Sequence, residues 1–261
     1  MSSIPGDEGP LGMKGRLMRR TAEAAVEKAF PGLGWRPLWL SVLATWALVA
    51  YLNFGRLADA PAWFIEAGVD LTGIEAPLFH QHGWAHLSAV VLLLLVPLTA
   101  CRLAEGWGLR ELGFRLRGAG PELRLVVALW LAFVPVIWLV SGTEGFARMY
   151  PRFPPAETDA GLFSLYEGFY LVKWISWEFF FRGFMLFGFR RDFGARAVLF
   201  STIPYTLVHW GKPELEMFSA LLGGLVLCFI ALRSRSIWPG VFLHFMVAAT
   251  MDFFASTWWM P

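Results

Sequence analysis

The sequence predicts an all-α polytopic membrane protein, a transmembrane helical bundle of about seven spans. Of its 261 residues, 57% are hydrophobic and only 16% are charged, whereas a soluble domain carries about 25% charged residues. The hydrophobic residues also gather in long runs, and the arginines gather between alternate runs. A chain of this length can form one bundle, but not a bundle together with a substantial soluble domain.

The first 34 residues contain no long apolar run, so no cleavable signal peptide is expected. Residues 13–30 are basic and amphipathic, with five Lys and Arg residues. A stretch of this kind commonly lies on the anionic cytoplasmic leaflet of a membrane. We therefore interpret residues 1–34 as a cytoplasmic basic amphipathic segment, with a solvated basic tail as the alternative.

Seven apolar runs follow this segment. Most of them are close to the ~20 residues that a helix needs to cross the hydrocarbon core. The fourth run is longer and the fifth shorter, which indicates a tilted or protruding helix at those places. The runs are 37–54, 84–101, 123–141, 162–189, 196–210, 215–232 and 237–255.

The loops between the runs differ in charge from one side to the other. Arginines are concentrated in residues 102–124, 190–196 and 233–235, which share a side with the basic N-terminus if there are seven spans. The opposite loops, residues 59–75 and 144–159, are richer in acidic residues. This positive-inside pattern predicts an integral multi-pass protein of the cell (inner or plasma) membrane, with a cytoplasmic N-terminus.

Isolated polar residues interrupt three of the last runs. Glu178 and Arg182 are four residues apart, and that spacing places them on one face of a helix. His209 and His244 lie in two later runs. Counted from the nearest arginine that marks the membrane surface, Glu178, His209 and His244 lie roughly 18, 20 and 14 Å deep. Ionisable groups at membrane depth are costly and usually mark a functional site, so we expect these residues to converge.

Their chemistry suits hydrolysis. A glutamate close to a histidine, both shielded from bulk water, can hold and deprotonate a water molecule. We expect Glu178, assisted by His209, to activate the water, and His244 to stabilise the oxyanion or bind a metal. Arg182 would set the charge and orientation of the Glu178 carboxylate. The alternative interpretation of Glu178 and Arg182 is a structural ion pair between helices.

The same residues resemble the motifs of a known family. The segment 177–183, Trp-Glu-Phe-Phe-Phe-Arg-Gly, is followed by Tyr205-Thr-Leu-Val-His209 and then by His244. This order is similar to that of the CPBP family, which comprises intramembrane type II CAAX prenyl endopeptidases and bacteriocin-processing or bacteriocin-immunity proteins. The resemblance covers residues 160 to 255. It implies a CAAX-protease-like core in the last four spans, residues 161–257, preceded by N-terminal transmembrane helices and loops at 35–160.

The chain departs from the family pattern at two positions. The pattern begins with Glu-Glu, and Trp177 stands where the first glutamate is expected. It ends with an Asn or Asp four residues after the last histidine, where this chain has Ala248. Asp252, two turns beyond His244, could supply the missing carboxylate, and Glu216 could turn toward the same cavity.

The resemblance implies an intramembrane endopeptidase of the metallo or glutamate type, acting on a prenylated (CAAX-like) or hydrophobic peptide or protein. A Zn²⁺ ion held by Glu178, His209 and His244 is one expectation, and a metal-free mechanism with the same atoms is the other. The expected partners are this substrate and membrane lipids, with no nucleic acid. Two alternatives remain: a catalytically altered immunity or scaffold protein, and a proton- or metal-coupled transporter.

Overall fold

The structure, a computed structural model, describes residues 13–67, 76–116 and 119–259. In these residues it contains helices and no strand, and each of the seven predicted apolar runs is mainly helical. The prediction of an all-α bundle is therefore confirmed. Several helices are longer than the predicted runs. The clearest case is the second run, because the polar residues before position 84 already belong to its helix, which begins at Ala76. The helix of the fifth run is α10 (Ala197–Leu207), so His209 lies in the turn that follows it.

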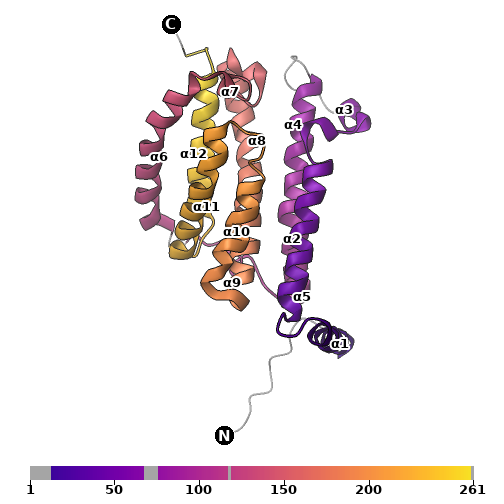
Figure 1. The fold of residues 1–261 in the computed structure, drawn as a ribbon. Coiled ribbons are helices and arrows are strands. Elements are labelled where there is room, and N and C mark those ends of the chain that lie inside the picture. The colour runs from indigo at the N-terminus through magenta and orange to yellow at the C-terminus, as the bar shows by residue number, and fades with distance from the viewer. Residues whose placement is uncertain (1–12, 68–75, 117–118, 260–261) are drawn as a thin grey trace.

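The helices divide into two groups that lie side by side (Figure 1). One group contains α2 (Trp35–Phe54) and a continuous stretch made of α4 (Ala76–Ala89), η2 (Val90–Leu95) and α5 (Val96–Glu105). Here η2 is a π-helical segment. Short helices η1 (Leu57–Asp59) and α3 (Ala62–Ala67) connect α2 to α4, and α1 (Met13–Ala29) packs against α2 at the N-terminal end.

The other group carries the polar residues. It contains α6 (Ala119–Ser141), the stretch α8 (Ala160–Glu178), η4 (Phe179–Phe187) and α9 (Gly188–Phe193), and then α10 (Ala197–Leu207), α11 (Glu214–Ser234) and α12 (Trp238–Ala255). Short helices α7 (Glu144–Ala147), η3 (Pro154–Glu157) and η5 (Gly194–Arg196) lie in the connections. The helix α12 packs most extensively against α6, and also contacts α8 and α11.

Five helices within the described residues are long and apolar enough to cross a membrane, judged by length and composition. They are Trp35–Phe54, Leu78–Glu105, Gly120–Ser141, Glu214–Ser234 and Trp238–Ala255. The other two predicted spans, 162–189 and 196–210, are not among these five helices. Charged residues interrupt the α8–α9 stretch, and α10 has only 11 residues. Seven crossings remain a prediction, whereas an integral membrane bundle agrees with the structure.

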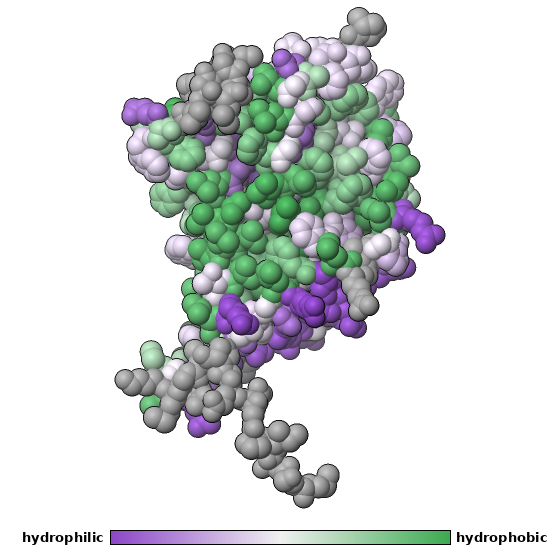
Figure 2. Space-filling view, turned by 180° about the vertical axis from the view of Figure 1, so that it is seen from behind, coloured by the Kyte–Doolittle hydropathy of each residue, from purple (hydrophilic) through white to green (hydrophobic). Residues whose placement is uncertain are grey.

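The outer surface suits a lipid environment. Large apolar side chains are exposed along the helices, among them Trp46, Leu139 and Phe218, which are 54%, 68% and 72% exposed. Hydrophobic residues cover a broad band of the surface, and strongly hydrophilic residues gather mainly toward its lower edge (Figure 2). In water such exposure would be unfavourable, but hydrocarbon chains are as apolar as these side chains.

The arginine-rich segments lie at one end of the bundle. Arg36, at the start of α2, forms ion pairs with Glu105 at the end of α5 (3.1 Å) and with Asp192 in α9 (3.2 Å). Arg233, at the end of α11, pairs with Glu122 at the start of α6 (2.9 Å). The structure thus brings the segments 102–124, 190–196 and 233–235 to the same end, as the charge pattern predicted.

Candidate active site

The site is built where α8 meets α12. Glu178 is the last residue of α8, and Arg182 follows one turn later in η4, a π-helical segment. Such segments are frequent at functional sites. Both side chains are fully buried, with no exposed surface. Their spacing of four residues therefore produces the ion pair that the sequence predicted, with 3.2 Å between Arg182 Nη1 and Glu178 Oε1.

Glu178 also contacts His244 on α12. The same carboxylate oxygen, Oε1, lies 2.8 Å from His244 Nδ1. A carboxylate only accepts hydrogen bonds, so the ring proton is assigned to Nδ1, and Nε2 of the neutral ring is left as an acceptor. This arrangement fixes both the orientation and the tautomer of His244. From the sequence we expected His209 as the partner of Glu178, whereas the structure places His244 there.

Arg182 is held by more than the carboxylate. Its Nη2 donates to the carbonyl oxygen of Gly224 on α11 at 3.4 Å, and its guanidinium lies 4.2 Å from the ring centroid of Tyr205 on α10. Breaking a buried ion pair by removing one partner leaves an uncompensated charge. The arginine therefore stabilises the negative charge of Glu178 and connects three helices around it.

Gly240 allows Glu178 and α12 to approach each other. A Cβ atom at this position would lie 2.8 Å from Glu178 Oε2, which is too close for a non-bonded contact. Only a residue without a side chain fits there, because the carboxylate is already held by Arg182 and His244. The first turn of α12 therefore packs directly against the Glu178 carboxylate.

Tyr205 connects the two histidines. His209 Nδ1 lies 2.8 Å from the backbone carbonyl of Tyr205, so this ring also carries its proton on Nδ1 and leaves Nε2 as an acceptor. The Tyr205 hydroxyl lies 3.5 Å from His244 Nε2. Both histidines are thus anchored through Nδ1, and the tyrosine lies between them.

The two histidines line one cavity of about 510 Å³. Its walls come mainly from α6, α8, α10, α11 and α12 and are mostly apolar, with Trp174, Leu227 and Val247 among them. Tyr205 and Ala248 also line it, whereas Glu178 does not. The carboxylate therefore lies behind His244, which separates it from the space that a substrate can enter.

Glu216 belongs to a polar group at one part of this cavity. Its Oε1 accepts from Lys212 Nζ at 2.6 Å, and its Oε2 accepts from the Tyr150 hydroxyl at 2.8 Å. Lys212 lies in the loop between α10 and α11, where burial lowers the pKa of its ammonium group and the neighbouring Glu216 opposes that shift. Glu216 lines the cavity, and its carboxylate is held in an ion pair with Lys212.

Asp252 does not join His244. Its Oδ1 accepts from the backbone N–H of Arg152 at 2.6 Å, and it lies near Glu167, a second buried carboxyl on α8. Eight residues of helix separate Asp252 from His244, about 12 Å along the axis. The expectation that Asp252 replaces the missing motif carboxylate is not supported by this placement.

The residues do not form the expected metal site. Within the described part of the chain, no group of three His, Cys, Asp or Glu side chains is arranged to hold a metal ion. Glu178 contacts Arg182 and His244 Nδ1 through Oε1, and it does not line the cavity that both histidines line, so the three side chains do not face one ion. In this arrangement the set Glu178, His209 and His244 does not fit a Zn²⁺ ion.

Two aromatic side chains for which the sequence predicted no role complete the site. Trp174 packs on the His244 ring with 3.8 Å between ring centroids, and Tyr205 joins both histidines. The sequence spacing could have identified both residues, because Trp174 precedes Glu178 by four residues and Tyr205 precedes His209 by four. Residues at that spacing share a helix face, so each aromatic residue was placed beside a predicted site residue.

Comparison with known proteins agrees with the motif pattern. Residues 160–250 match the family model described as type II CAAX prenyl endopeptidase Rce1-like. This range contains Glu178, Arg182, His209 and His244, and it begins with α8 and ends within α12. No curated protein and no solved structure gives a significant match to the chain.

Proposed function

We propose that this chain, whose residues 160–250 match the family model of type II CAAX prenyl endopeptidase Rce1-like proteins, is an intramembrane endopeptidase. Its substrate would be a prenylated (CAAX-like) or hydrophobic peptide or protein, cleaved at a peptide bond within the membrane. The family points to a protease in general, and the substrate class and the roles of individual residues are our inference.

One observation carries the proposal. His244 is anchored by a buried glutamate at 2.8 Å and lines a cavity of about 510 Å³ together with His209. A structural ion pair between Glu178 and Arg182 would not need a histidine that also lines a cavity. A histidine oriented by a carboxylate on one nitrogen is, in contrast, the arrangement of a general base.

The proposed reaction starts with a water molecule near Nε2 of His244 and Nε2 of His209. His244 Nε2 takes a proton from the water as the water oxygen attacks the carbonyl carbon of the scissile bond. Glu178 stabilises the imidazolium that forms, through the proton on Nδ1. Nε2 of neutral His209 accepts the second water proton in a hydrogen bond and so helps to position the nucleophile.

The carbonyl oxygen becomes negative in the tetrahedral intermediate. The Tyr205 hydroxyl is a donor beside His244 and is the group that we assign to this oxyanion. As the C–N bond breaks, the imidazolium of His244 returns its proton to the leaving amine. Arg182 does not touch the substrate in this scheme, and it keeps Glu178 ionised while the proton moves.

The cavity suits an apolar substrate. Its lining includes leucine, valine, methionine and aromatic side chains. Its polar groups are the histidines, Tyr170, Tyr205, Ser219 and the Lys212–Glu216 pair with Tyr150. Its volume falls within the ~300–1,000 Å³ range of small-molecule and cofactor pockets. A hydrophobic peptide segment therefore fits this environment better than a highly charged one.

A second function is favoured by a specific observation. Trp177 packs against Tyr51 of α2 at 5.7 Å between ring centroids, and Ala248 gives the cavity wall a methyl group. Both positions carry acidic or amide residues in the family pattern. A catalytically altered protein, acting in immunity or as a scaffold, would keep the buried Glu178–Arg182 pair for its fold and have no turnover.

Cleavage by the purified protein separates the two functions. The full chain in liposomes would be incubated with farnesylated peptides and with the same peptides lacking the lipid, and the products followed by mass spectrometry. We expect cleavage by the wild type and by Glu144→Gln, an exposed control, but none by His244→Ala. Absence of cleavage with every peptide, while the protein remains folded, would support the scaffold function.

A further inference from the structure

A second cavity lies on the other side of α10, away from the histidines. It is a groove of about 650 Å³ between α2 and α10, and we call it the α2–α10 groove. Met185 of η4 and Phe189 of α9 also line it, and none of its lining residues lines the candidate active site. The groove therefore needs an explanation that does not depend on proteolysis.

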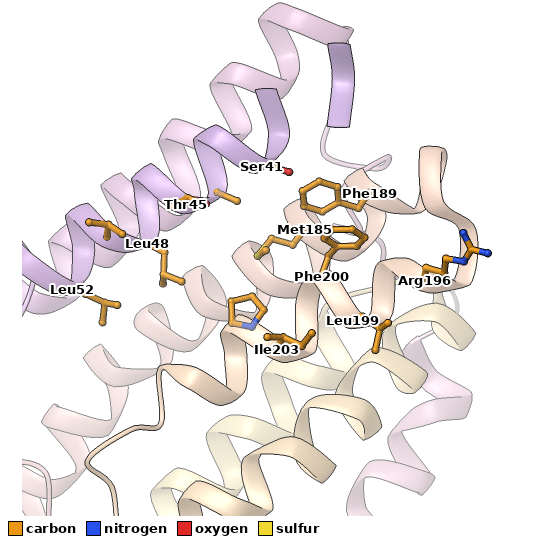
Figure 3. Close-up of a pocket in the computed structure, with 13 residues that line it drawn as sticks. Ser41, Thr45, Leu48, Leu52, Met185, Phe189, Arg196, Leu199, Phe200 and Ile203 are labelled. Carbon is orange, nitrogen blue, oxygen red and sulfur yellow. The ribbon is translucent and has the colours of Figure 1, made fainter. Parts of the chain in front are cut away.

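The walls of this groove are almost entirely apolar. Side chains such as Leu48, Leu199 and Ile203 face it, and Leu199 and Ile203 are 55% and 54% exposed. Ser41, Thr45 and Arg196 are its polar residues, and no acidic residue lines it. Arg196 lies at one end of the groove and Leu52 at the opposite end, with the apolar side chains between them (Figure 3).

The length of the groove corresponds to one leaflet. Ser41 and Leu52 mark its extent along α2, and eleven residues of helix rise about 16 Å. The hydrocarbon core of a bilayer is about 30 Å thick, so the groove reaches about its middle. A membrane-spanning helix of a partner protein needs about 20 residues, so the groove is too short to hold one. Its length suits a lipid acyl chain from a single leaflet.

The polar end of the groove is positive. Arg196 has no ion pair or hydrogen-bond partner for its side chain among the residues that the structure describes, and it is the N-cap of α10. The positive end of the α10 dipole favours an anion at the same place. Arg196 lies on the side of the arginine-rich loops, where an anionic leaflet is predicted.

We propose that the α2–α10 groove binds an anionic glycerophospholipid from the leaflet on the side of the arginine-rich loops. One acyl chain lies along the apolar walls, and the phosphate contacts the Arg196 guanidinium. The bound lipid fills the space between the two groups of helices and connects α2 to the protease-like core. This inference does not rest on the proposed enzymatic function.

The test measures lipid binding by the full chain. Purified protein, stripped of lipid in detergent, would be titrated with phosphatidylglycerol and with phosphatidylcholine of the same acyl chains, and bound lipid counted by native mass spectrometry. We expect phosphatidylglycerol to bind more tightly to the wild type. Arg196→Gln should lower phosphatidylglycerol affinity about fivefold, because a single basic residue near an anionic surface contributes about that factor.

Two further variants test the acyl-chain part. Thr45→Trp on α2 and Ile203→Trp on α10 put an indole into the groove, and each should remove the tight lipid. The matched controls are Arg190→Gln, an exposed arginine outside the groove, and Leu139→Trp on α6, which lines neither cavity. Both controls should bind as the wild type does.

A photoactivatable phosphatidylglycerol should label peptides of α2 and α10. The proposal is overturned if Arg196→Gln keeps the full preference for the anionic lipid, or if neither tryptophan variant lowers lipid occupancy. It is also overturned if the photoactivatable lipid labels other helices only. Cross-linking of the groove to a second copy of this chain, in place of lipid, would equally contradict it.

Discussion

Replacing Glu178 by glutamine removes the charge that holds His244 and compensates Arg182. In our mechanism the neutral amide cannot stabilise the imidazolium of His244, and it can present either oxygen or nitrogen to the ring. General acid–base catalysis contributes about 10²- to 10⁴-fold, so kcat should fall by about that factor. This corresponds to about 3–5 kcal/mol of transition-state stabilisation.

The same change has a structural cost that must be separated from the catalytic one. Arg182 is fully buried, and removing its partner leaves an unpaired charge that costs about 3 kcal/mol or more. The double variant Glu178→Gln with Arg182→Met removes both charges and keeps an apolar side chain of similar length. It should regain most of the thermal stability that the single variant loses.

The assay measures kcat for cleavage of a peptide substrate, and the melting temperature of each variant is measured on the same liposome preparations. We expect the double variant to recover stability but to stay at the low kcat of Glu178→Gln, because His244 still lacks its carboxylate. Recovery of kcat together with stability would refute the reasoning. It would mean that Glu178 serves only to neutralise Arg182.

The site geometry makes three further predictions. Tyr205→Phe removes the hydroxyl beside His244 Nε2 but keeps the ring, so kcat should fall about 10²-fold with little change in melting temperature. An unchanged kcat would exclude the hydroxyl from the reaction. Gly240→Ala places a methyl group against Glu178 and should lower kcat about tenfold or more. The control Gly168→Ala on α8 adds a methyl group with no atom within 4 Å of it, and it should leave kcat unchanged. Cleavage should survive a Zn²⁺ chelator such as phenanthroline, and its loss, restored by added Zn²⁺, would contradict the metal-free mechanism.

Much of the fold could be predicted because hydrophobic length and arginine placement are direct consequences of the bilayer. The seven apolar runs are mainly helical, and the ion pairs of Arg36 and Arg233 bring the arginine-rich segments to one end. Helix ends were harder to predict. The residues before position 84 are polar enough to resemble a loop, yet α4 begins at Ala76, and its His82 and His86 pack against Tyr166 of α8.

The site was predicted in part. The spacing of Glu178 and Arg182 determines their ion pair directly, because residues four apart share a helix face. Depth along the membrane placed His209 and His244 at a similar level, but depth does not tell which way a helix is rotated about its axis. Rotation decides the partner, and it places His244, not His209, on Glu178.

Asp252 shows a second limit of prediction from sequence. Its position two turns after His244 suggested the same face of α12, and the structure instead satisfies its carboxylate with the backbone of Arg152. Residues 151–153 belong to a connection between short helices, and their approach to α12 depends on tertiary packing. No periodicity in the sequence encodes that contact.

Hydrolysis in water enriched in oxygen-18 tests the central claim most directly. Purified wild-type protein in liposomes would be incubated with a farnesylated peptide, and the new C-terminal carboxylate examined by mass spectrometry. Our account predicts two product peptides, incorporation of one oxygen-18 atom at the cleaved bond, and loss of both products in His244→Ala. An intact peptide with folded wild-type protein, or undiminished labelling in His244→Ala, would contradict it.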